Sequence, residues 1–434
     1  MKPVVTEWLV MRGVPLVRYQ ADATGVARSH GAGMMGVFVR QVILVLVLLS
    51  GGTLSVPSIA ATSAPQTSDE LSAVISQLCS RKVVLLGEDA NHAGTQTIAL
   101  KADIARRLIT SCGFRGVVFE SQFYDFVDVQ RALDQGTSSL PQFSSAIGAL
   151  WSHYAEFKPF EAWLYAQALA KHVLVAGIDP QVGGIDARFS QEKLPSVISS
   201  VLGGDDRVRC HEAIARHNAW AYDDAHPFDD AAFATLDQCL RTSAVSTTAH
   251  SGVEAGRTAA MIASYQAYLR SIAPHAANGG LRDKAMYENL LWVLSQWPKD
   301  TKVLIWTATV HAAKAPMEGN TPGQQTLGTY IRKAWGGDAY ALGFSALGGA
   351  YGSTGGHGQV HPLVAPPPDS LEALAFSKAP DREAARFLDE KVLKRLGNVP
   401  GRAFNYGTFQ TVDWSRYVDG IVVLRTETAH AAVD

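Results

Sequence analysis

The sequence is poor in the features that mark several specialised classes of protein. Its 38 Lys and Arg are balanced by 40 Asp and Glu, so no excess of positive charge indicates a nucleic-acid partner. No apolar run reaches the roughly 18 residues that a membrane span requires, which excludes a multi-pass membrane protein. No internal repeat, P-loop, nucleophile elbow or dinucleotide-binding glycine motif is present. The 434 residues, 47% of them hydrophobic and 18% charged, instead predict a globular protein with a large core.

One apolar stretch near the N-terminus predicts export. Val42–Leu49 follows Arg40 and precedes small residues that end at Ala60 and Ala61. A charged residue, a short apolar segment and small residues before a cleavage point form a secretory signal peptide, here cleaved after Ala60. A membrane anchor fits this layout less well. We therefore predict a periplasmic or secreted protein.

The predicted signal lies deep in the chain. Its apolar segment is far from Met1, whereas Met34 and Met35 lie shortly before it. We expect translation to start at this pair, so that the residues before it are an upstream extension. The predicted domains are accordingly 1–60, the upstream extension and signal peptide, and 61–434, a mature chain without a membrane span.

The few cysteines fit an exported protein. All four, Cys79, Cys112, Cys210 and Cys239, follow the signal, and none has the Cys-x-x-Cys spacing of a zinc or redox site. Four cysteines allow three pairings. We favour Cys79–Cys112 and Cys210–Cys239, each closing a loop of about 30 residues that stabilises the fold by about 3–4 kcal/mol. Four buried thiols are the alternative.

The first part of the mature chain predicts a strand, a helix and a second strand. Val83–Gly87 is a continuous apolar run ended by glycine, typical of a strand buried on both faces. Apolar residues recur at helical spacing over Thr97–Cys112, and a second buried strand follows at Gly116–Glu120. Parallel strands joined by a helix end at one edge of a sheet, where ligands bind in open α/β folds. Glu88 and Glu120 are therefore expected to lie close together.

The rest of the chain extends this pattern to an α/β fold. Glu192–Trp297 shows helical spacing with charged faces and no strong strand, and Gly348–Pro368 is a loop rich in glycine and proline. We predict a central, mostly parallel sheet flanked by helices, with a helical insertion at about 192–297. Further buried strands are expected at Val173–Asp179, Val303–Thr307, Tyr340–Phe344 and Gly420–Leu424.

Acids and histidines are predicted at the carboxyl ends of these strands. Glu88 and His92 follow the first strand. Glu120 ends the second, and His311 follows the strand at Val303–Thr307. A neutral imidazole held by a carboxylate can take a proton from water, while a second histidine or a cation stabilises the developing oxyanion. A lone histidine on a loop is more often a surface residue and a strand-end acid often a helix cap, so only the combination indicates hydrolysis.

These residues resemble the erythromycin esterase-like family. That family opens with a strand, Gly-Glu-x-x-His-Gly, a helix and a strand ending in Phe-Glu, which resembles LLGEDANHAGTQTIALKADIARRLITSCGFRGVVFES here. The resemblance covers about 81–419 and implies an α/β fold that hydrolyses an ester of a small molecule, such as a macrolide lactone, with no cofactor and no required metal. Later blocks resemble the family in the same order: Phe123-Tyr124-Asp125, Trp151 with Glu156, Gly177–Gln181, Arg282–Met286 with Asn289 and Trp292, and Trp306 to Lys314.

The resemblance also implies roles for individual residues. His92 corresponds to the general base and Glu120 to the carboxylate that orients or activates it. Glu88 is the first acid of the motif, and His311 is the second histidine of the later block. Lys101 takes the place of a basic residue on the helix that follows the motif. The implied catalytic residues are His92, Glu120, Glu88 and His311, and the implied substrate-binding residues are Lys101, Asp89 and Arg282.

Two departures from the family pattern leave the activity open. Glu88 and His92 are four positions apart where the family has three, so either Glu88 or Asp89 matches the acid of the motif. Ala308 and Thr309 replace a histidine and an asparagine of the later block. The lost imidazole supports an alternative, a non-catalytic or ligand-binding member of the same fold.

A metal-dependent hydrolase is a further alternative. Glu88, His92, Glu120 and His311 provide the ligand types that zinc or manganese accepts. Water activation by an imidazole that a carboxylate orients needs no ion. An exported, metal-independent ester hydrolase is therefore the favoured prediction.

Overall fold

A computed structural model describes residues 68–184, 186–273, 280–317, 324–352 and 359–429. The chain divides into two units, Met1–Thr62 and Ser63–Asp434, and every described residue belongs to the second. The predicted upstream extension, signal peptide and start at Met34 and Met35 lie outside the described residues. Among the helices that these residues form, none combines the length and the apolar character that crossing a membrane requires.

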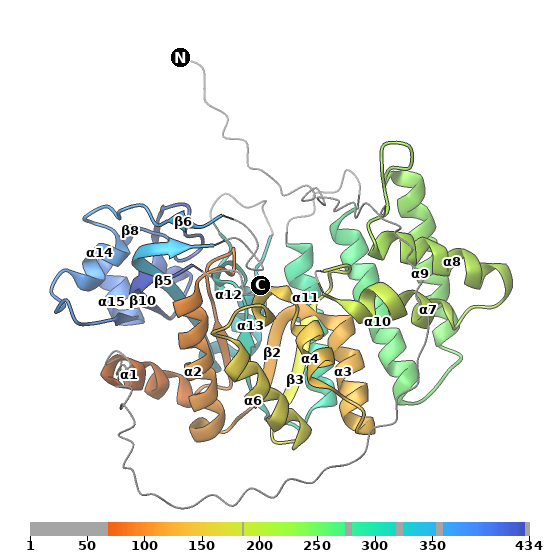
Figure 1. The fold of residues 1–434 in the computed structure, drawn as a ribbon, viewed down its shortest axis with the longest axis horizontal. Coiled ribbons are helices and arrows are strands. Elements are labelled where there is room, and N and C mark those ends of the chain that lie inside the picture. The colour runs from red at the N-terminus through yellow and green to blue at the C-terminus, as the bar shows by residue number, and fades with distance from the viewer. Residues whose placement is uncertain (1–67, 185, 274–279, 318–323, 353–358, 430–434) are drawn as a thin grey trace, which may run out of the picture. The chain divides into compact units, whose positions relative to one another are not determined.

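The second unit is built on an eight-stranded sheet. The strand order is β3-β2-β4-β1-β5-β10-β7, and β6 pairs with the end of β5. All neighbours from β3 to β10 are parallel, whereas β7 and β6 are antiparallel to their partners. The predicted α/β fold with a mostly parallel central sheet is confirmed (Figure 1). The strands are β1 (Val83–Leu86), β2 (Phe114–Gln122), β3 (Leu174–Asp179), β4 (Lys302–Trp306), β5 (Ala339–Tyr351), β6 (His361–Pro362), β7 (Ala385–Asp389) and β10 (Gly420–Glu427).

Helices connect the strands (Figure 1). Before β3 these are α1 (Ser68–Cys79), α2 (Thr95–Cys112), α3 (Phe123–Gln135), α4 (Leu140–Ile147), α5 (Ala149–Ser152) and α6 (Lys158–Leu169). Between β3 and β4 lies first a π-helical turn (Phe189–Lys193), which begins just before the helical insertion predicted at about 192–297. Within that stretch follow α7 (Leu194–Ser199), α8 (Gly204–Asn218), α9 (Asp230–Thr247), α10 (Val253–Ser271) and α11 (Leu281–Gln296). After β4 follow α12 (Thr309–Ala312), α13 (Leu327–Trp335), α14 (Leu371–Phe376), α15 (Glu390–Leu396) and a two-stranded sheet of β8 (Asn398–Gly401) and β9 (Gln410–Asp413).

The side chains of each central strand alternate between two hydrophobic cores. In β1, Val84 and Leu86 belong to a core that includes residues of α1, α2 and α6. Val83 and Leu85 belong to a core that includes residues of α10, α11 and α13. All four side chains are at most 3% exposed. Because helices cover both faces of the sheet, its strands read as continuous apolar runs, which is why the runs predicted them.

One strand is longer than predicted. The sequence predicts a strand over Tyr340–Phe344 and a loop from Gly348, but β5 continues to Tyr351. It continues because β10 pairs with it as far as Gly349 and β6 pairs with its last two residues. Gly349 has a φ of 104°, and a Cβ there would lie 2.0 Å from the carbonyl oxygen of Glu427. Pairing with neighbouring strands thus outweighs the low strand propensity of the glycines.

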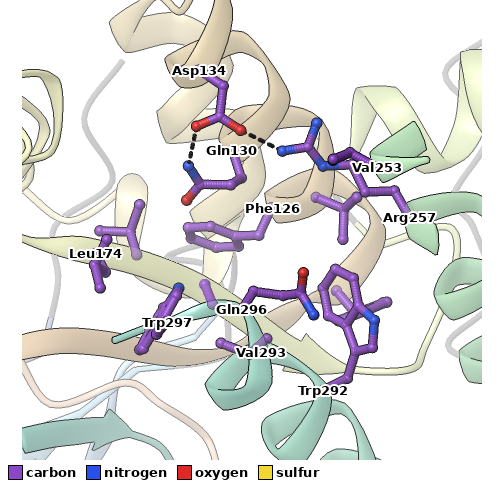
Figure 2. A pocket seen from close by; sticks show the side chains of 15 residues that line it. Phe126, Gln130, Asp134, Leu174, Val253, Arg257, Trp292, Val293, Gln296 and Trp297 are labelled. Atoms are coloured by element: carbon purple, nitrogen blue, oxygen red, sulfur yellow. Dashed lines mark hydrogen bonds and ion pairs between the residues drawn. The ribbon is translucent and has the colours of Figure 1, made fainter. Parts of the chain in front are cut away.

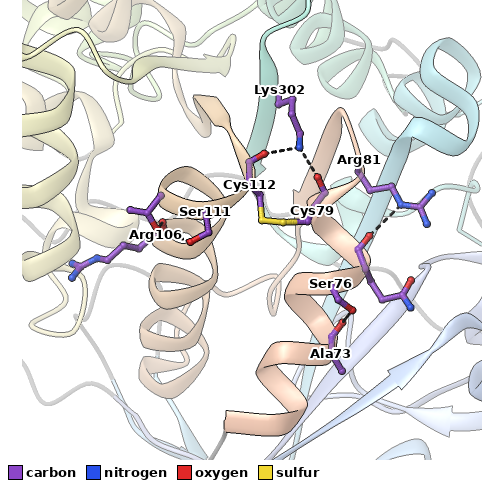
Figure 3. Close-up of a disulfide and its surroundings, with 10 residues drawn as sticks. Ala73, Ser76, Cys79, Arg81, Arg106, Ser111, Cys112 and Lys302 are labelled. Atoms are coloured by element: carbon purple, nitrogen blue, oxygen red, sulfur yellow. Dashed lines mark hydrogen bonds between the residues drawn. A yellow bond between two sulfur atoms is a disulfide. The ribbon is translucent and has the colours of Figure 1, made fainter.

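Two disulfides join the cysteines in the predicted pairing. Cys79–Cys112 links the ends of α1 and α2 (Figure 3), and Cys210–Cys239 links α8 to α9. Lys302, at the start of β4, donates from Nζ to the carbonyl oxygen of Cys112 at 2.7 Å, as Figure 3 shows. The alternative of four thiols is wrong. The first disulfide fixes the helix ends from which the chain enters β1 and β2.

Candidate active site

Four predicted site residues, together with Asp179, lie at the carboxyl edge of the sheet. Glu88 and His92 follow β1, Glu120 lies near the end of β2, and Asp179 ends β3. His311 lies in α12, directly after β4. Because β3, β2, β4 and β1 are neighbours in the sheet, their ends gather these side chains at one place.

The first of two polar clusters is built on Glu88. Its Oε1 lies 2.8 Å from Nδ1 of His92 and accepts a hydrogen bond from Nε1 of Trp151 at 2.6 Å. Its Oε2 lies 2.8 Å from Nζ of Lys101. Burial disfavours the charged form, but Lys101 and His92 outweigh it and hold the pKa of Glu88 below its ordinary value. An ionised Glu88 can only accept hydrogen bonds, so Nδ1 of His92 carries the proton.

This pairing leaves the other ring nitrogen of His92 available. Nε2 makes no hydrogen bond to any residue that the structure describes, and the side chain is 8% exposed. The ring stands edge-on to Trp151, with 5.3 Å between the ring centroids. With the proton on Nδ1, Nε2 has a free lone pair and can act as a base.

Lys101 completes the first cluster from α2. Its side chain is fully buried, and its Nζ donates to the carbonyl oxygen of Thr307 at 3.3 Å and lies 4.4 Å from the ring centroid of Trp306. Burial lowers its pKa to about 8, although the carboxylates of Glu88 and Glu120 oppose the shift. Lys101 is thus a buried cation for Glu88. A direct contact with substrate, which the resemblance implied, does not fit a side chain without exposed surface.

The second cluster is built on Glu120. Its Oε1 accepts from Nη2 of Arg282 at 3.0 Å and lies 3.2 Å from Nε2 of His311. Its Oε2 accepts from the hydroxyl of Thr307 at 2.6 Å and from the backbone N–H of Ala308 at 2.9 Å. Burial disfavours ionisation here too, but His311 and Arg282 hold the pKa of Glu120 well below its ordinary value. Glu120 is a carboxylate whose two oxygens are both occupied.

Two further acids hold the cations of this cluster. Asp179 accepts from Nε and Nη2 of Arg282, at 3.1 and 2.8 Å, and Oδ1 of Asp283 lies 2.8 Å from Nδ1 of His311. Burial by itself lowers the pKa of His311, but the carboxylates of Asp283 and Glu120 outweigh it and raise the pKa to about 10. His311 is therefore an imidazolium at neutral pH. The cluster holds two cations between three carboxylates.

One nitrogen of Arg282 is left for a ligand. Nη1 lies 3.1 Å from Nε2 of His311, but a protonated Nε2 has no lone pair to accept a hydrogen bond. Among the described residues, Nη1 makes no other polar contact, and the side chain of Arg282 is 30% exposed. A carbonyl oxygen or an anion can therefore bind at Nη1.

Thr307 joins the two clusters. Its carbonyl oxygen accepts from Lys101, and its hydroxyl donates to Glu120. The two clusters also act on each other electrostatically, because the carboxylate of Glu120 opposes the lowering of the pKa of Lys101. A free imidazole nitrogen and a free guanidinium nitrogen thus belong to one polar centre.

A turn accommodates the extra residue between Glu88 and His92. The N–H of His92 donates to the carbonyl oxygen of Asp89 at 2.9 Å, and His92 takes a left-handed φ of 54°. The side chain of Asp89 is buried, and Oδ2 accepts from the N–H of Asn91 at 3.0 Å. The turn returns the imidazole to Glu88, so Glu88, and not Asp89, is the acid that binds His92.

Besides that of Lys101, two predicted roles differ from the contacts seen here. The carboxylate on His92 is Glu88 from the same loop, whereas Glu120, from a neighbouring strand, binds Arg282 and His311. Asp89 binds backbone N–H groups and has 1% of its surface exposed, so a contact with substrate does not fit it. Sequence reasoning assigned no role to Trp151, Asp179, Asp283 and Thr307, although Asp179 ends a predicted strand and Asp283 follows Arg282.

The two residues that depart from the later family block face the interior. Ala308 is 1% exposed and uses its N–H for Glu120, while Thr309 is fully buried. The N–H of Thr309 donates to the carbonyl oxygen of Glu88 at 2.7 Å. A Cβ on Gly87 would lie 2.6 Å from the hydroxyl of Thr309, so this close approach requires the glycine of the motif.

The described residues contain no group of three or more His, Cys, Asp or Glu arranged to hold a metal ion. The reason is visible in the contacts. Glu88 and Glu120 lie in different clusters, and the oxygens of each are occupied by nitrogen and hydroxyl groups. The proposed ligand set of Glu88, His92, Glu120 and His311 is therefore divided between two sites.

A cavity of about 330 Å³ lies elsewhere, along β3, the edge strand of the sheet (Figure 2). Residues of α3, α10 and α11 surround Leu174–Gly177, and Trp292 and Trp297 give it aromatic walls. Figure 2 shows Arg257 bound to Asp134 at its border. None of the predicted site residues lines this cavity. The clusters around Glu88 and Glu120 are the candidate active site, because perturbed titratable groups gather there.

Comparisons with known proteins agree with this architecture. The family model described as erythromycin esterase matches residues 109–426, a range that begins after the loop of Glu88 and His92. No curated protein sequence matches the chain.

Three solved structures share the fold. A succinoglycan biosynthesis protein is 14% identical, with a TM-score of 0.65 over 84% of this chain and 92% of its own. A Bacillus cereus protein is 16% identical, with a TM-score of 0.61 over 84% and 93%. An erythromycin esterase mutant, EreC, in its open conformation is 13% identical, with a TM-score of 0.61 over 83% and 95%. At these identities the likeness establishes the fold alone.

Proposed function

Because the chain belongs to the erythromycin esterase family, we propose that it is an exported hydrolase that cleaves an ester or lactone bond of a small molecule. One observation carries the proposal, the contact of 2.8 Å between Nδ1 of His92 and Oε1 of Glu88. It fixes the tautomer of an imidazole whose Nε2 is free. Such an imidazole is the usual general base for activating water at neutral pH.

The two clusters divide the reaction between them. The carbonyl oxygen of the ester binds Nη1 of Arg282, and Nε2 of His92 takes a proton from a water molecule that attacks the carbonyl carbon. The oxyanion that forms is stabilised by Arg282 and by the neighbouring imidazolium of His311. The carbon–oxygen bond then breaks, and the imidazolium of His92 returns its proton to the leaving alkoxide. The products are a carboxylic acid and an alcohol, or one hydroxy acid from a lactone.

The other polar residues keep these groups in place. Lys101 and Trp151 hold Glu88, which stabilises the imidazolium that forms on His92. Asp179 and Glu120 fix the plane of the Arg282 guanidinium through three hydrogen bonds. A bidentate carboxylate restricts a guanidinium far more than a single contact would.

A macrolide lactone is the first substrate to test, because one structural relative is named an erythromycin esterase. The family histidine replaced by Ala308 would have added an imidazole to the later block. Its loss favours the second candidate, a member of the fold that binds a ligand without hydrolysing it.

Export is supported by the two disulfides, which persist in oxidising compartments.

The test is a panel of esters and lactones, including a macrolide, incubated with the mature protein and analysed by mass spectrometry. Addition of one water to any member, lost in His92→Ala, supports hydrolysis. Binding of a panel member without turnover would support the second candidate instead. The panel is run with and without a chelator, and activity that a chelator removes and zinc or manganese restores would favour the metal-dependent alternative.

Export is tested on protein recovered from the periplasm or the medium. We expect an N-terminus near Ala61 and no thiols that react before reduction. A chain that begins at Met1 in that fraction would contradict the proposed signal peptide.

A further inference from the structure

The loop that carries His92 has an unusual conformation. His92 has a left-handed φ of 54°, a region that non-glycine residues enter at a cost of about 1 kcal/mol or more. No regular helix or strand includes residues 87–94. The pairing of His92 with Glu88 therefore depends on contacts that fix the loop from outside, since strained conformations persist only where the surroundings determine them.

The first of these contacts holds the beginning of the loop. Oδ1 of Asp89 accepts from the backbone N–H of Tyr406 at 2.6 Å, and the N–H of Ala90 donates to the carbonyl oxygen of Phe404 at 3.1 Å. The loop and the segment 404–406 are thus joined in both directions. Asp89 and Tyr406 are 1% and 3% exposed, so water does not compete for these bonds.

A second group of contacts holds the end of the loop. The hydroxyl of Tyr406 donates to Oε2 of Glu427 at 3.0 Å. Oε1 of Glu427 accepts from the N–H of Gln96 at 2.8 Å, and Oε2 accepts from the hydroxyl of Thr97 at 2.5 Å. Glu427 is fully buried, and these hydrogen bonds fix the first turn of α2, the helix that also carries Lys101.

We infer that Asp89, Tyr406 and Glu427, called the clasp below, are positioning residues that hold His92 in register with Glu88. The inference rests on the proposed function. Asp89 fixes the loop before His92, Glu427 fixes it after His92, and Tyr406 connects the two by its backbone and its hydroxyl. None of the three touches the free Nε2 of His92.

The clasp also explains two local features of the chain. A Cβ on Gly94 would lie 2.5 Å from Oε2 of Glu427, so the loop passes against this carboxylate only because residue 94 is glycine. Glu427, at the end of β10, lies outside every predicted motif and is nevertheless one of the most deeply buried acids. A buried carboxylate with hydrogen bonds to a helix start is suited to fix that start in place.

The expected effect is a loss of turnover with little change in substrate binding. Releasing the loop misplaces the base and leaves Arg282 as it is. Misplacement of a reacting group by about 1 Å costs about a hundredfold. We expect kcat to fall about 10–100-fold in Asp89→Ala, with an unchanged KM.

Tyr406→Phe keeps the backbone bond to Asp89 and loses one hydroxyl, so we expect kcat to fall about 3–10-fold. Asp89→Asn retains the oxygen that accepts from the backbone N–H of Tyr406, so its kcat should lie between those of wild type and Asp89→Ala.

Glu372→Gln is the matched control. Glu372 is also a fully buried acid near the C-terminus, and it accepts from Ser345 and from the backbone N–H of Arg402. It has no contact with the loop of His92 among the described residues. The control should lose stability without the drop in kcat.

The experiment combines kinetics with hydrogen exchange on the full mature protein. In Asp89→Ala and Tyr406→Phe, amide exchange should rise in the peptide 87–97 and stay unchanged in the strands. In a His92→Ala background, Asp89→Ala should cause no further loss of kcat, because a released loop cannot misplace an absent base. Multiplicative losses in the double variant would overturn the inference, as would loop exchange that does not change.

Failure of the proposed function gives a different result. If wild type and His92→Ala hydrolyse the best ester equally, the general base is wrong and the clasp cannot position it. If His92→Ala loses activity and the clasp variants retain full kcat, only the positioning role is overturned.

Discussion

The Glu88 cluster and the Glu120 cluster are both centred on a buried carboxylate, yet they are assembled differently. Glu88 finds its imidazole in the same loop, four residues away, and its lysine on the next helix. Glu120 depends on Arg282 and His311, which follow it by well over a hundred residues. The orientation of the base is therefore a local property, whereas the cationic group exists only once distant segments have packed.

The two clusters also differ in exposure and charge. In the first, Glu88 and Lys101 form a buried pair closed to solvent. In the second, the side chains of Arg282 and His311 are 30% and 15% exposed. A closed cluster is suited to fixing a tautomer, and an open one is suited to binding a substrate oxygen. Four variants test this division of roles.

His92→Ala should lower kcat/KM by about 10²–10⁴-fold, the range for a general base, and should also lower the melting temperature without unfolding the protein at the assay temperature. The side chain is 8% exposed and bound to Glu88, so truncation leaves a small cavity and takes one hydrogen-bond partner from a buried carboxylate. Steady-state kinetics and a thermal melt check both parts. His226→Ala is the control, because that histidine lies in the loop between α8 and α9 and its side chain is 63% exposed. Unchanged turnover in His92→Ala would assign the base to another residue.

Lys101→Met should lower the free energy of unfolding by about 3–5 kcal/mol, because it leaves the buried charge of Glu88 uncompensated. Adding Glu88→Gln removes that charge and should restore part of the stability without restoring activity. Chemical denaturation of the single and double variants measures the difference. Equal stability in wild type and Lys101→Met would show that the pair does not hold the first cluster together.

Arg282→Lys should lower kcat/KM by about 10²–10³-fold, because a lysine has neither the forked contact with Asp179 nor a spare Nη1. Arg257→Lys is the matched control. Arg257 is also held by two acids, Asp134 and Glu254, but it lies at the cavity of Figure 2. If both variants lose activity equally, the effect of Arg282 is structural and the division between the clusters fails.

His311→Gln should flatten the dependence of stability on pH. The pKa of His311 is raised to about 10 in the folded protein, after the opposing effect of burial, against about 6.5 when unfolded. The raised pKa of His311 contributes to the free energy of unfolding fully below pH 6.5. This contribution is lost as the pH rises to 10, by on the order of 1 kcal/mol per pH unit. Burial lowers the pKa of Lys101 to about 8. Loss of its proton above pH 8 therefore raises the stability of the folded protein, in the opposite direction to the effect of His311.

Because Lys101 titrates in the same pH range, the quantity to measure is the difference in the free energy of unfolding between wild type and His311→Gln. Urea unfolding at several pH values gives this difference. The difference should be largest below pH 6.5 and should shrink towards pH 10. A constant difference across this range would mean that His311 is neutral in the folded protein, and that Nη1 of Arg282 donates to it.

Much of the sheet follows from local sequence. Apolar runs such as Val83–Gly87 predicted the strands because burial on both faces demands them. The end of β5 was not predictable in this way, since glycine-rich segments adopt strand geometry only when neighbours pair with them. The strands β6, β7, β8 and β9 were not predicted either, because none of these short segments is a continuous apolar run. The disulfide pairing was predicted from the sequence separations and agrees with the structure.

Four chemical groups of the site could be predicted from their positions along the chain. Glu88, His92, Glu120 and His311 directly follow or end buried strands, and parallel strands deliver such residues to one edge of a sheet. Which of these groups contact one another depends on how distant segments pack. The tertiary structure placed Glu88 rather than Glu120 on His92, buried Lys101 and Asp89, and brought Asp179 and Asp283 to the two cations. Hydrogen bonds form over about 3 Å, a distance that motif spacing does not define when the partners lie on separate strands and helices.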